Sequence, residues 1–345
     1  MPYDTGEATR RVLARVGHHA GVTQLARSLA DHTVGPRLLI LMYHRIADAP
    51  DRFHPALPTQ TFHDQIAYLA KHYPCLTAQQ VCDIMQASRR LTRTSVLVTF
   101  DDGYRDTATI AAPILQRYGM PATVFLATGA IGTGEALWPD RLGDAFKKTA
   151  QEMLTCDQWP GLPARLMLRT LAERLAALNQ VRAYGKQIPQ VGLDAFVQEI
   201  ERRLGVSGLR ADGMLSWEQV RQLDRDGMSI GAHTVHHPIL SRLPLEQAQE
   251  EILRSKQEIE QRLGHSIAMF CYPNGTFSDI TPPIARLVER AGFVAAVSAE
   301  DGANDHHSDR FSLLRVAAYQ KHVPRFALQL VKAQRASVTA DRLPT

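Results

Sequence analysis

The sequence predicts an α/β fold, a distorted (β/α) barrel in which parallel strands alternate with helices. Short apolar runs such as residues 37–44 and 95–100 lack a polar alternation, which is typical of strands buried on both faces. Segments with apolar residues at helical spacing follow these runs. The number of strand–helix repeats in 345 residues favours a closed or nearly closed barrel over an open sheet.

The first half of the barrel is expected before residue 130. Residues 5–31 have helical spacing, and Gly35 and Pro36 then lead into the first strand. Later apolar runs predict strands at 95–100 and 122–128. Helical spacing predicts the intervening helices at 62–73, 77–88 and 106–119.

Residues from about 132 to 212 interrupt this alternation. They have helical periodicity, a Trp-Pro pair twice and no convincing buried strand, so we expect a helical insertion. The alternation then resumes, with a long charged helix at 245–264 that we expect to begin near Ser241. Further elements are expected at 216–227 (helix), 228–233 (strand), 268–273 (strand), 282–292 (helix) and 293–299 (strand).

The predicted organisation is an N-terminal helical extension (1–35), a barrel (36–325) with the insertion at about 132–212, and a C-terminal tail (326–345). The net charge of +4 is too small and too evenly mixed to indicate a nucleic-acid partner. The four cysteines form no CxxC pair, so we expect reduced thiols. Neither a secretory signal nor a transmembrane segment is evident, which favours a cytoplasmic location with peripheral membrane contact left open.

Two polar motifs lie where predicted strands end, TFDDGY (99–104) and GAHTVHHP (231–238). Catalytic groups converge at the C-terminal ends of strands in parallel barrels. His233 and His237 are four residues apart, and an aspartate would complete a set of two histidines and one carboxylate that suits an open hydrolytic metal site. Adjacent aspartates point in different directions, so one can face the ion while the other accepts a proton from water. Either motif alone is more simply a turn or polar loop, but together they favour the metal site.

With FCYPNG at 270–275, these motifs resemble the first three motifs of carbohydrate esterase family four, the polysaccharide deacetylases with the NodB homology domain. A looser similarity extends from about residue 41 to 319. The resemblance implies that Asp101 is the general base, that Asp102, His233 and His237 bind the metal, and that the backbone N–H of Asn274 stabilises the oxyanion. We expect substrate contacts from Tyr104, Tyr272, Pro273 and Trp138.

The sequence departs from the family pattern at Cys271, which stands where an arginine usually orients the catalytic aspartate. A small residue there resembles the branch of biofilm poly-N-acetylglucosamine deacetylases, in which a Tyr-His pair near the start supplies the general acid. His44 fits that role, although a strand-end histidine with a satisfied hydrogen bond is the simpler interpretation. Arg315 could turn back and pair with a carboxylate, but a surface salt bridge is the commoner role of a lone arginine.

Other polar residues receive weaker assignments. The usual late histidine is not found, because His306 and His307 lie in a polar run typical of a loop. His236 should point away from an ion held by its neighbours, and Thr234 either braces the loop or simply favours extended backbone. Trp138, with Asp140 and Arg141, either stacks on sugar rings or packs the start of a helix.

The function expected from these features is removal of an N-acetyl group from an amino sugar of a bacterial polysaccharide or of its lipid- or nucleotide-linked precursor. Zinc is the default metal, with cobalt, nickel and iron open. A cytoplasmic location would favour the precursor. Two alternatives stay open: an amidohydrolase or deformylase acting on a small or lipid-linked substrate, and a non-catalytic glycan-binding relative that has lost the arginine and the late histidine.

Overall fold

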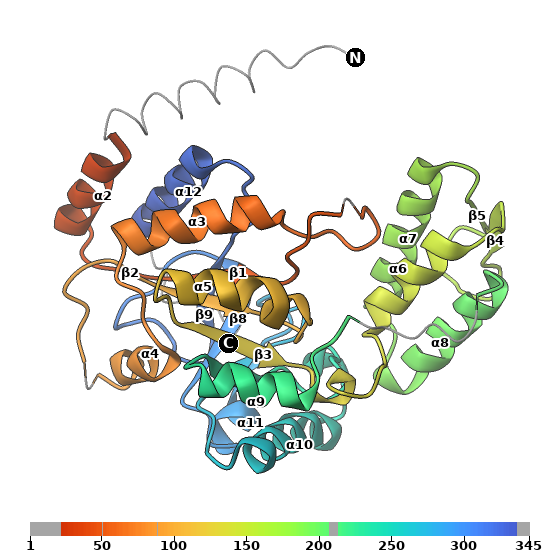
Figure 1. The fold of residues 1–345 in the computed structure, drawn as a ribbon. Coiled ribbons are helices and arrows are strands. Elements are labelled where there is room, and N and C mark those ends of the chain that lie inside the picture. Colours follow the sequence, from red (N-terminus) through yellow and green to blue (C-terminus); the bar gives the residue numbers. More distant parts are fainter. Residues whose placement is uncertain (1–21, 50, 88, 207–212, 337–345) are drawn as a thin grey trace.

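The protein is a closed barrel of seven parallel strands, as predicted. The computed structural model describes residues 22–49, 51–87, 89–206 and 213–336. The strands follow one another around the barrel in chain order, and β9 pairs with β1 to close it (Figure 1). They are β1 (Leu38–Tyr43), β2 (Ser95–Phe100), β3 (Ala122–Leu126), β6 (Ser229–Ala232), β7 (Met269–Cys271), β8 (Ala295–Asp301) and β9 (Leu313–Ala317).

Burial on both faces explains why the strands read as continuous apolar runs. All six residues of β1 and all six of β2 are buried. Leu39 and Val98 belong to a cluster that includes the surrounding helices, whereas their neighbours Ile40 and Leu97 belong to a second cluster shared with residues of β7, β8 and α4 (Ala78–Met85). Successive side chains of a strand alternate between its faces, so both faces are covered by apolar groups.

Helices surround the barrel and begin at clear sequence signals. Thr77 and Ser216 form capping boxes at the starts of α4 and α9 (Trp217–Arg225), each with a glutamine three residues later. The remaining helices of this layer are α3 (Thr59–His72), a π-helical turn (Thr107–Ala111) that continues into α5 (Ala112–Arg117), α10 (Leu245–Leu263) and α11 (Pro282–Arg290).

The start of α10 differs from the prediction. The helix begins at Leu245 rather than near Ser241, which lies in a separate 3₁₀ turn, Leu240–Arg242. Pro244 disfavours helical backbone at the residue before it, so the chain cannot run continuously from Ser241 into the helix.

The prediction of a C-terminal tail from residue 326 is wrong for the first ten residues, which belong to a packed helix. Helix α12 (Val323–Arg335) buries Phe326 and Leu330 and lies beside α3 and α2 (Val22–Thr33) (Figure 1). Gln334 of α12 donates to Asp31 of α2 at 2.7 Å. The apolar spacing of α12 therefore indicated a helix that packs on the core. Residues 337–345 of the predicted tail, and residues 1–21 of the predicted N-terminal extension, lie outside the described residues.

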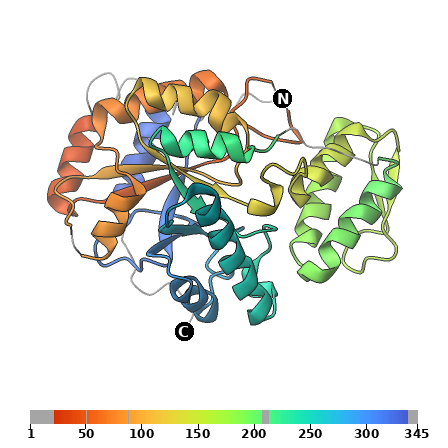
Figure 2. The same cartoon turned by 60° about the horizontal axis from the view of Figure 1, so that its bottom comes forward.

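The insertion forms a separate lobe beside the barrel (Figures 1 and 2). It has its own apolar core, to which Phe146, Leu178 and Val197 contribute. Its elements are α6 (Trp138–Lys148), β4 (Met153–Thr155), β5 (Arg165–Met167), α7 (Leu171–Gly185) and α8 (Gln190–Arg203). The antiparallel pair β4–β5 was not predicted, because each strand has three residues with one buried side chain and so leaves no apolar run.

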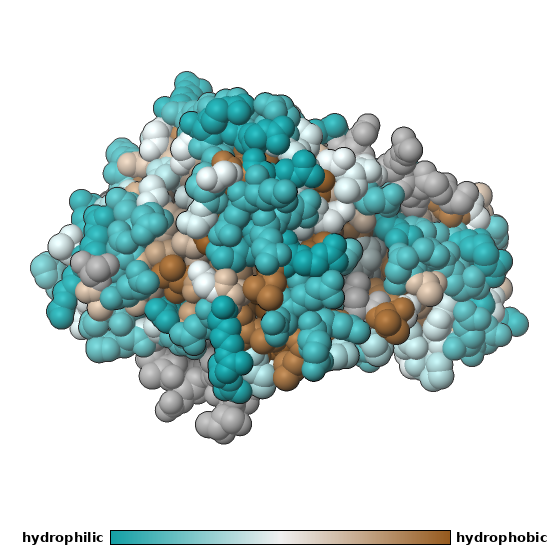
Figure 3. All heavy atoms as spheres, turned by 90° about the horizontal axis from the view of Figure 1, so that it is seen from below, coloured by the Kyte–Doolittle hydropathy of each residue, from teal (hydrophilic) through white to brown (hydrophobic). Residues whose placement is uncertain are grey.

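The face of the molecule drawn in Figure 3 is mostly hydrophilic, with hydrophobic residues in patches among the hydrophilic ones. All four cysteines are free, as expected. Among the helices of the described residues, none is both long and apolar enough to cross a membrane.

Candidate active site

A cavity of about 700 Å³ lies where the barrel strands end and the insertion begins. Its wall includes Asp101 and Asp102 after β2, His233 and His237 after β6, and Asn274 after β7. The cavity therefore gathers residues from motifs that are far apart in the sequence. This placement confirms that the predicted groups converge at the C-terminal ends of the strands.

Asp102, His233 and His237 form the tightest cluster. Nε2 of His233 lies 3.4 Å from Oδ1 of Asp102, and Nε2 of His237 lies 3.3 Å from the same oxygen. Asp102 and His237 have φ angles of 75° and 59°, in the left-handed region. Such backbone conformations cost free energy and concentrate at functional sites.

Thr234 holds the histidine loop in this shape. It is fully buried and has a φ of 65°. Its hydroxyl donates to the carbonyl of His233 and accepts from the backbone N–H of His237 at 3.0 Å. Of the two roles considered for Thr234, the structure therefore shows the first, in which its hydroxyl braces the loop.

These three side chains fit a divalent metal ion. Their ligand atoms lie within 4.8 Å of one another. Oδ1 of Asp102 is buried without a hydrogen-bond partner in the described chain. Buried polar atoms normally have a partner, so a metal ion at this oxygen would account for the missing one. Nδ1 of His233 lies 2.7 Å from the carbonyl oxygen of Cys271; a donated hydrogen bond there leaves Nε2 as the free lone pair. Ligands about 2.1 Å from a tetrahedral ion lie about 3.4 Å apart, close to the observed separations.

A second group, Asp101, His233 and Cys271, also has ligand atoms within 4.8 Å, but its chemistry is less suitable. Asp101 is ion-paired with Arg315, and Nδ1 of His233 is bonded to a carbonyl oxygen. Burial raises the pKa of the Cys271 thiol, which disfavours the thiolate that binds metals. Asp102, His233 and His237 are therefore the better candidate of the two groups for holding a metal ion.

Arg315 supplies the support for Asp101 that Cys271 cannot give. Arg315 is 1% exposed, and its Nη1 donates to Oδ1 of Asp101 at 2.7 Å. Burial opposes ionisation of Asp101, but the Arg315 charge and hydrogen bond, with His44 nearby, lower the pKa of its carboxyl overall. The commoner interpretation of Arg315 as a surface salt bridge is wrong, because strand β9 places it inside the barrel next to β2's end.

His44 lies on the other side of Asp101. Its Nε2 is 3.8 Å from Oδ2 of Asp101, and its Nδ1 lies 2.8 Å from the hydroxyl of Tyr319. Both His44 and Tyr319 line the cavity. His44 therefore has a hydrogen-bond partner, as the simpler interpretation expected, and also occupies a position from which Nε2 can reach a substrate.

Asn274 presents its backbone to the cavity in a strained conformation, with a φ of 60°. Its backbone N–H makes no hydrogen bond within the described residues. The side chain is fixed from both ends: Nδ2 donates to Asp279 at 2.6 Å, and Oδ1 accepts from Lys186 of the insertion lobe at 2.7 Å. A fixed side chain with an unpaired N–H suits the predicted oxyanion donor.

The predicted substrate contacts are only partly placed on the cavity wall. Tyr104, Tyr272 and Trp138 line it, but Pro273 does not. Pro273 is buried, and its carbonyl accepts from Gly275 in the turn that shapes Asn274. Tyr272 is 2% exposed and packs edge-on against Phe270, so it serves mainly as core.

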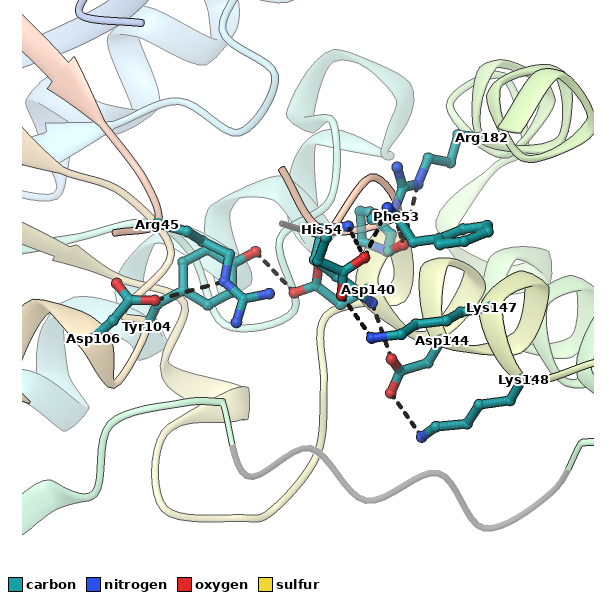
Figure 4. A network of polar contacts seen from close by, with 12 residues as sticks. Arg45, Phe53, His54, Tyr104, Asp106, Asp140, Asp144, Lys147, Lys148 and Arg182 are labelled. Carbon is teal, nitrogen blue, oxygen red and sulfur yellow. Dashed lines mark hydrogen bonds and ion pairs between the residues drawn. The ribbon is translucent and has the colours of Figure 1, made fainter. Parts of the chain in front are cut away.

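A polar network joins the insertion to the barrel beside this cavity (Figure 4). Asp140 of α6 accepts from the hydroxyl of Tyr104 at 2.8 Å, and its other oxygen lies 3.2 Å from Nδ1 of His54. Nε2 of His54 lies 2.9 Å from Asp144. Arg182 of α7 donates to the carbonyls of Phe53 and Pro139. The cluster predicted around Trp138 thus includes Asp140, which anchors the lobe.

Other assigned residues lie away from the reaction centre. Arg141 pairs with Asp194 and Glu201 inside the lobe and is absent from the cavity wall. His236 points to Glu251, 2.6 Å from Nδ1, and so away from the Asp102, His233 and His237 cluster, as predicted. His306 and His307 are exposed in a turn, which confirms the predicted loop.

Sequence reasoning missed Tyr319, His54, Arg182 and Lys186. Tyr319 ends the run LLRVAAY, and its strand-end position was the available signal. The other three lie in a loop or on the insertion, and no local pattern connects them with the barrel motifs. Only the way the two lobes pack brings them to the cavity.

Comparisons with known proteins agree with this fold and site. The family model for polysaccharide deacetylase matches residues 88–295. YxkH of Bacillus subtilis (strain 168), described as a polysaccharide deacetylase, is 22% identical over 281 residues, covering 81% of this chain and 71% of YxkH.

Two solved structures share the fold. The Streptococcus pyogenes deacetylase PplD in complex with acetate aligns with a TM-score of 0.57 and 17% identity, covering 86% of this chain and 98% of PplD. IcaB from Ammonifex degensii aligns with a TM-score of 0.56 and 20% identity, covering 88% of this chain and 98% of IcaB. Since the family model spans more than half of the sequence, and the motifs that it covers form the cavity described above, the chain belongs to the polysaccharide deacetylase family.

Proposed function

We propose that the protein is a metal-dependent deacetylase that removes an N-acetyl group from an amino sugar of a bacterial polysaccharide or of its lipid- or nucleotide-linked precursor. The observation that carries this proposal is the pairing of two adjacent carboxylates with different partners. Asp102 faces two histidine nitrogens, whereas Asp101 is bound to Arg315. Asp102 is therefore placed to bind a metal ion, and Asp101 is placed to accept a proton.

Asp101 would act as the general base. Its Oδ1 is occupied by Arg315, so Oδ2 is the oxygen left to accept a proton from the attacking water. The Arg315 charge keeps the carboxylate ionised in a buried position and fixes its orientation. A divalent ion held by Asp102, His233 and His237 would supply Lewis-acid activation of the acetamide carbonyl and of water.

The remaining groups would stabilise the oxyanion and release the amine. Water attacks the carbonyl carbon, and the N–H of Asn274 donates to the carbonyl oxygen as negative charge develops. The C–N bond then breaks, acetate is released, and the amine nitrogen takes a proton from Nε2 of His44. Tyr319 fixes His44 through Nδ1, so Nε2 stays directed toward Asp101.

We propose zinc as the metal, because two imidazoles and one carboxylate with an open position are typical of catalytic zinc sites. Cobalt, nickel and iron accept the same ligands. The decisive measurement is acetate release by the purified protein after chelation and after addition of each metal. We expect no activity without metal and recovery on reconstitution, with zinc retained at one equivalent.

Of the alternatives, the non-catalytic glycan-binding relative loses its motivation. It rested on the absent arginine and the absent late histidine, whereas Asp101 has an arginine, Arg315, and a histidine, His44, beside it. The substrate preference distinguishes the amidohydrolase alternative from the proposed deacetylase. Acetate release from N-acetylated sugars, without hydrolysis of formylated or simple acyl amides, would exclude the amidohydrolase. The cytoplasmic location favoured by the sequence is part of this proposal, and recovery of the protein in an exported fraction would contradict it.

A further inference from the structure

The cavity carries cationic side chains that the deacetylation of a neutral acetamide does not use. Five line its wall: Arg45, Arg182, Lys186, Arg315 and Lys321. Two are ion-paired, Arg45 with Asp106 and Arg315 with Asp101. The other three have no carboxylate within ion-pair distance in the parts of the chain that the structure describes.

The three unpaired cations come from both lobes. Arg182 and Lys186 are four residues apart at the end of α7, so they share one side of the helix. Lys321 follows β9 in the barrel, two residues after Tyr319. Lys186 also donates to the side chain of Asn274, which places its ammonium group next to the proposed oxyanion donor.

Arg182 is fixed in place but retains free donors. Its Nε and Nη2 bond the carbonyl oxygen of Pro139, and Nη2 also bonds that of Phe53. Figure 4 shows the side chain reaching from the insertion toward Phe53 and His54. No hydrogen bond from Nη1 is found within the described chain, so this nitrogen remains available to a ligand.

Of the three carboxylates on the wall, Asp140 lies near enough to Arg182 for its charge to offset part of the burial effect that lowers the pKa of Arg182, although the described residues form no ion pair between them. Arg315 binds Asp101, two histidines face Asp102, and Tyr104 and His54 contact Asp140. Cations elsewhere on the insertion are commonly ion-paired; examples are Arg141, Lys147, Lys148 and Arg203. Arg165 and Arg174 of the lobe also have no carboxylate within ion-pair distance among the described residues, so the distinguishing feature of the cavity is that three such cations line one wall.

The space beside these cations suits a sugar carrying a further group. Trp138, Pro139 and Ile239 give the wall an apolar part on which a sugar ring can pack. A volume of about 700 Å³ lies within the usual range for pockets that bury a whole small-molecule ligand. The cavity thus has room for an amino sugar together with an attached anionic group.

We propose that Arg182, Lys186 and Lys321 form a subsite for a phosphate or diphosphate attached to the amino sugar. This rests on the proposed function and selects the phosphate-linked precursor from its two substrate classes. Arginine and lysine bind phosphate oxygens through charge-assisted hydrogen bonds. Three cations on the wall of one cavity match a multiply charged group better than a single sugar carboxylate.

The kinetic test compares three substrates with the metal-loaded enzyme: UDP-N-acetylglucosamine, neutral diacetylchitobiose, and an N-acetylated disaccharide that contains glucuronic acid. We expect the highest kcat/KM for the diphosphate. In Arg182→Gln and Lys321→Gln the ratio of its kcat/KM to that of the neutral disaccharide should fall at least tenfold. Lys148→Gln, an ion-paired lysine on the same lobe that does not line the cavity, should leave the ratio unchanged. An unchanged ratio in both subsite variants, or preference for the uronate, would overturn the proposal.

A binding experiment separates this inference from the proposed function. The dissociation constant of UDP-N-acetylglucosamine is measured by calorimetry on metal-loaded Asp101→Asn protein, with and without Lys321→Gln. Lys321 is exposed, so its replacement spares the fold even if Arg182→Gln does not. A tenfold weaker binding with Lys321→Gln supports the subsite even if no substrate releases acetate. Equal binding, with acetate released from the neutral disaccharide, rejects the subsite and leaves the deacetylase intact.

Discussion

Arg315 is the residue whose position most changes the interpretation of the sequence. The third motif has Cys271 where an arginine is usual, which left Asp101 without support. In the folded chain the guanidinium comes from β9, 214 residues further along the sequence, and is buried against Asp101. A charged side chain buried to this degree needs a partner of opposite charge, so Arg315 and Asp101 are best regarded as one unit.

Replacing Arg315 by methionine should leave the Asp101 carboxylate buried without a counter-charge. We expect the free energy of unfolding to fall by about 3–5 kcal/mol and kcat/KM to fall by a factor on the order of 10². Denaturant unfolding and acetate release measure the two effects. The double variant Arg315→Met with Asp101→Asn should recover part of the lost stability, because the unpaired charge is removed; an additive loss would contradict the coupling.

Tyr319 is expected to act as a positioning residue for His44. Tyr319→Phe removes the hydrogen bond to Nδ1 and frees the imidazole to rotate. We expect kcat to fall about fivefold to tenfold with little change in KM, the loss of roughly 1 kcal/mol that one hydrogen bond contributes.

The matched control for this variant is Tyr118→Phe, which removes a similar tyrosine–histidine contact of 2.9 Å, with His63, away from the cavity. It should leave kcat unchanged. Equal effects of the two variants would show that the Tyr319 contact has no role in the reaction.

At the scale of elements, α6 connects the lobe to the barrel. A glycine, Gly143, stands in the interior of this helix, where alanine is normally favoured by about 1 kcal/mol. An added Cβ there would lie 2.7 Å from Cε1 of His54 and 2.8 Å from Nη2 of Arg182. The absent side chain therefore allows both residues to approach the helix.

Gly143→Ala should reverse the usual effect of this substitution. We expect the melting temperature to fall and the affinity for UDP-N-acetylglucosamine to weaken, because His54 and Arg182 must move. Gly192→Ala in α8, where the nearest atom would lie at an ordinary 3.4 Å, is the control and should be neutral or stabilising. A higher melting temperature for Gly143→Ala would show that His54 and Arg182 adjust freely.

For the whole molecule, the sequence predicted the barrel because strands buried on both faces leave continuous apolar runs. It also predicted that Asp102, His233 and His237, which could hold a metal ion, lie together, since they come from two local motifs at strand ends. Local patterns could not reveal contacts made by distant segments. Arg315, Tyr319 and Lys186 reach the cavity only through closure of the barrel and packing of the insertion, and α12 was mistaken for a tail because its apolar face is covered by remote helices.

In the proposed reaction Asp101 is the base and Asp102 a metal ligand, and the variant Asp101→Asn separates these two roles. Asparagine keeps the shape of the side chain and removes its basicity, while Asp102, His233 and His237 remain. Acetate release should be measured together with bound metal. We expect one equivalent of metal to be retained and the rate to fall by a factor on the order of 10² to 10⁴. Acetate release at the native rate by the metal-loaded variant would contradict this division of roles.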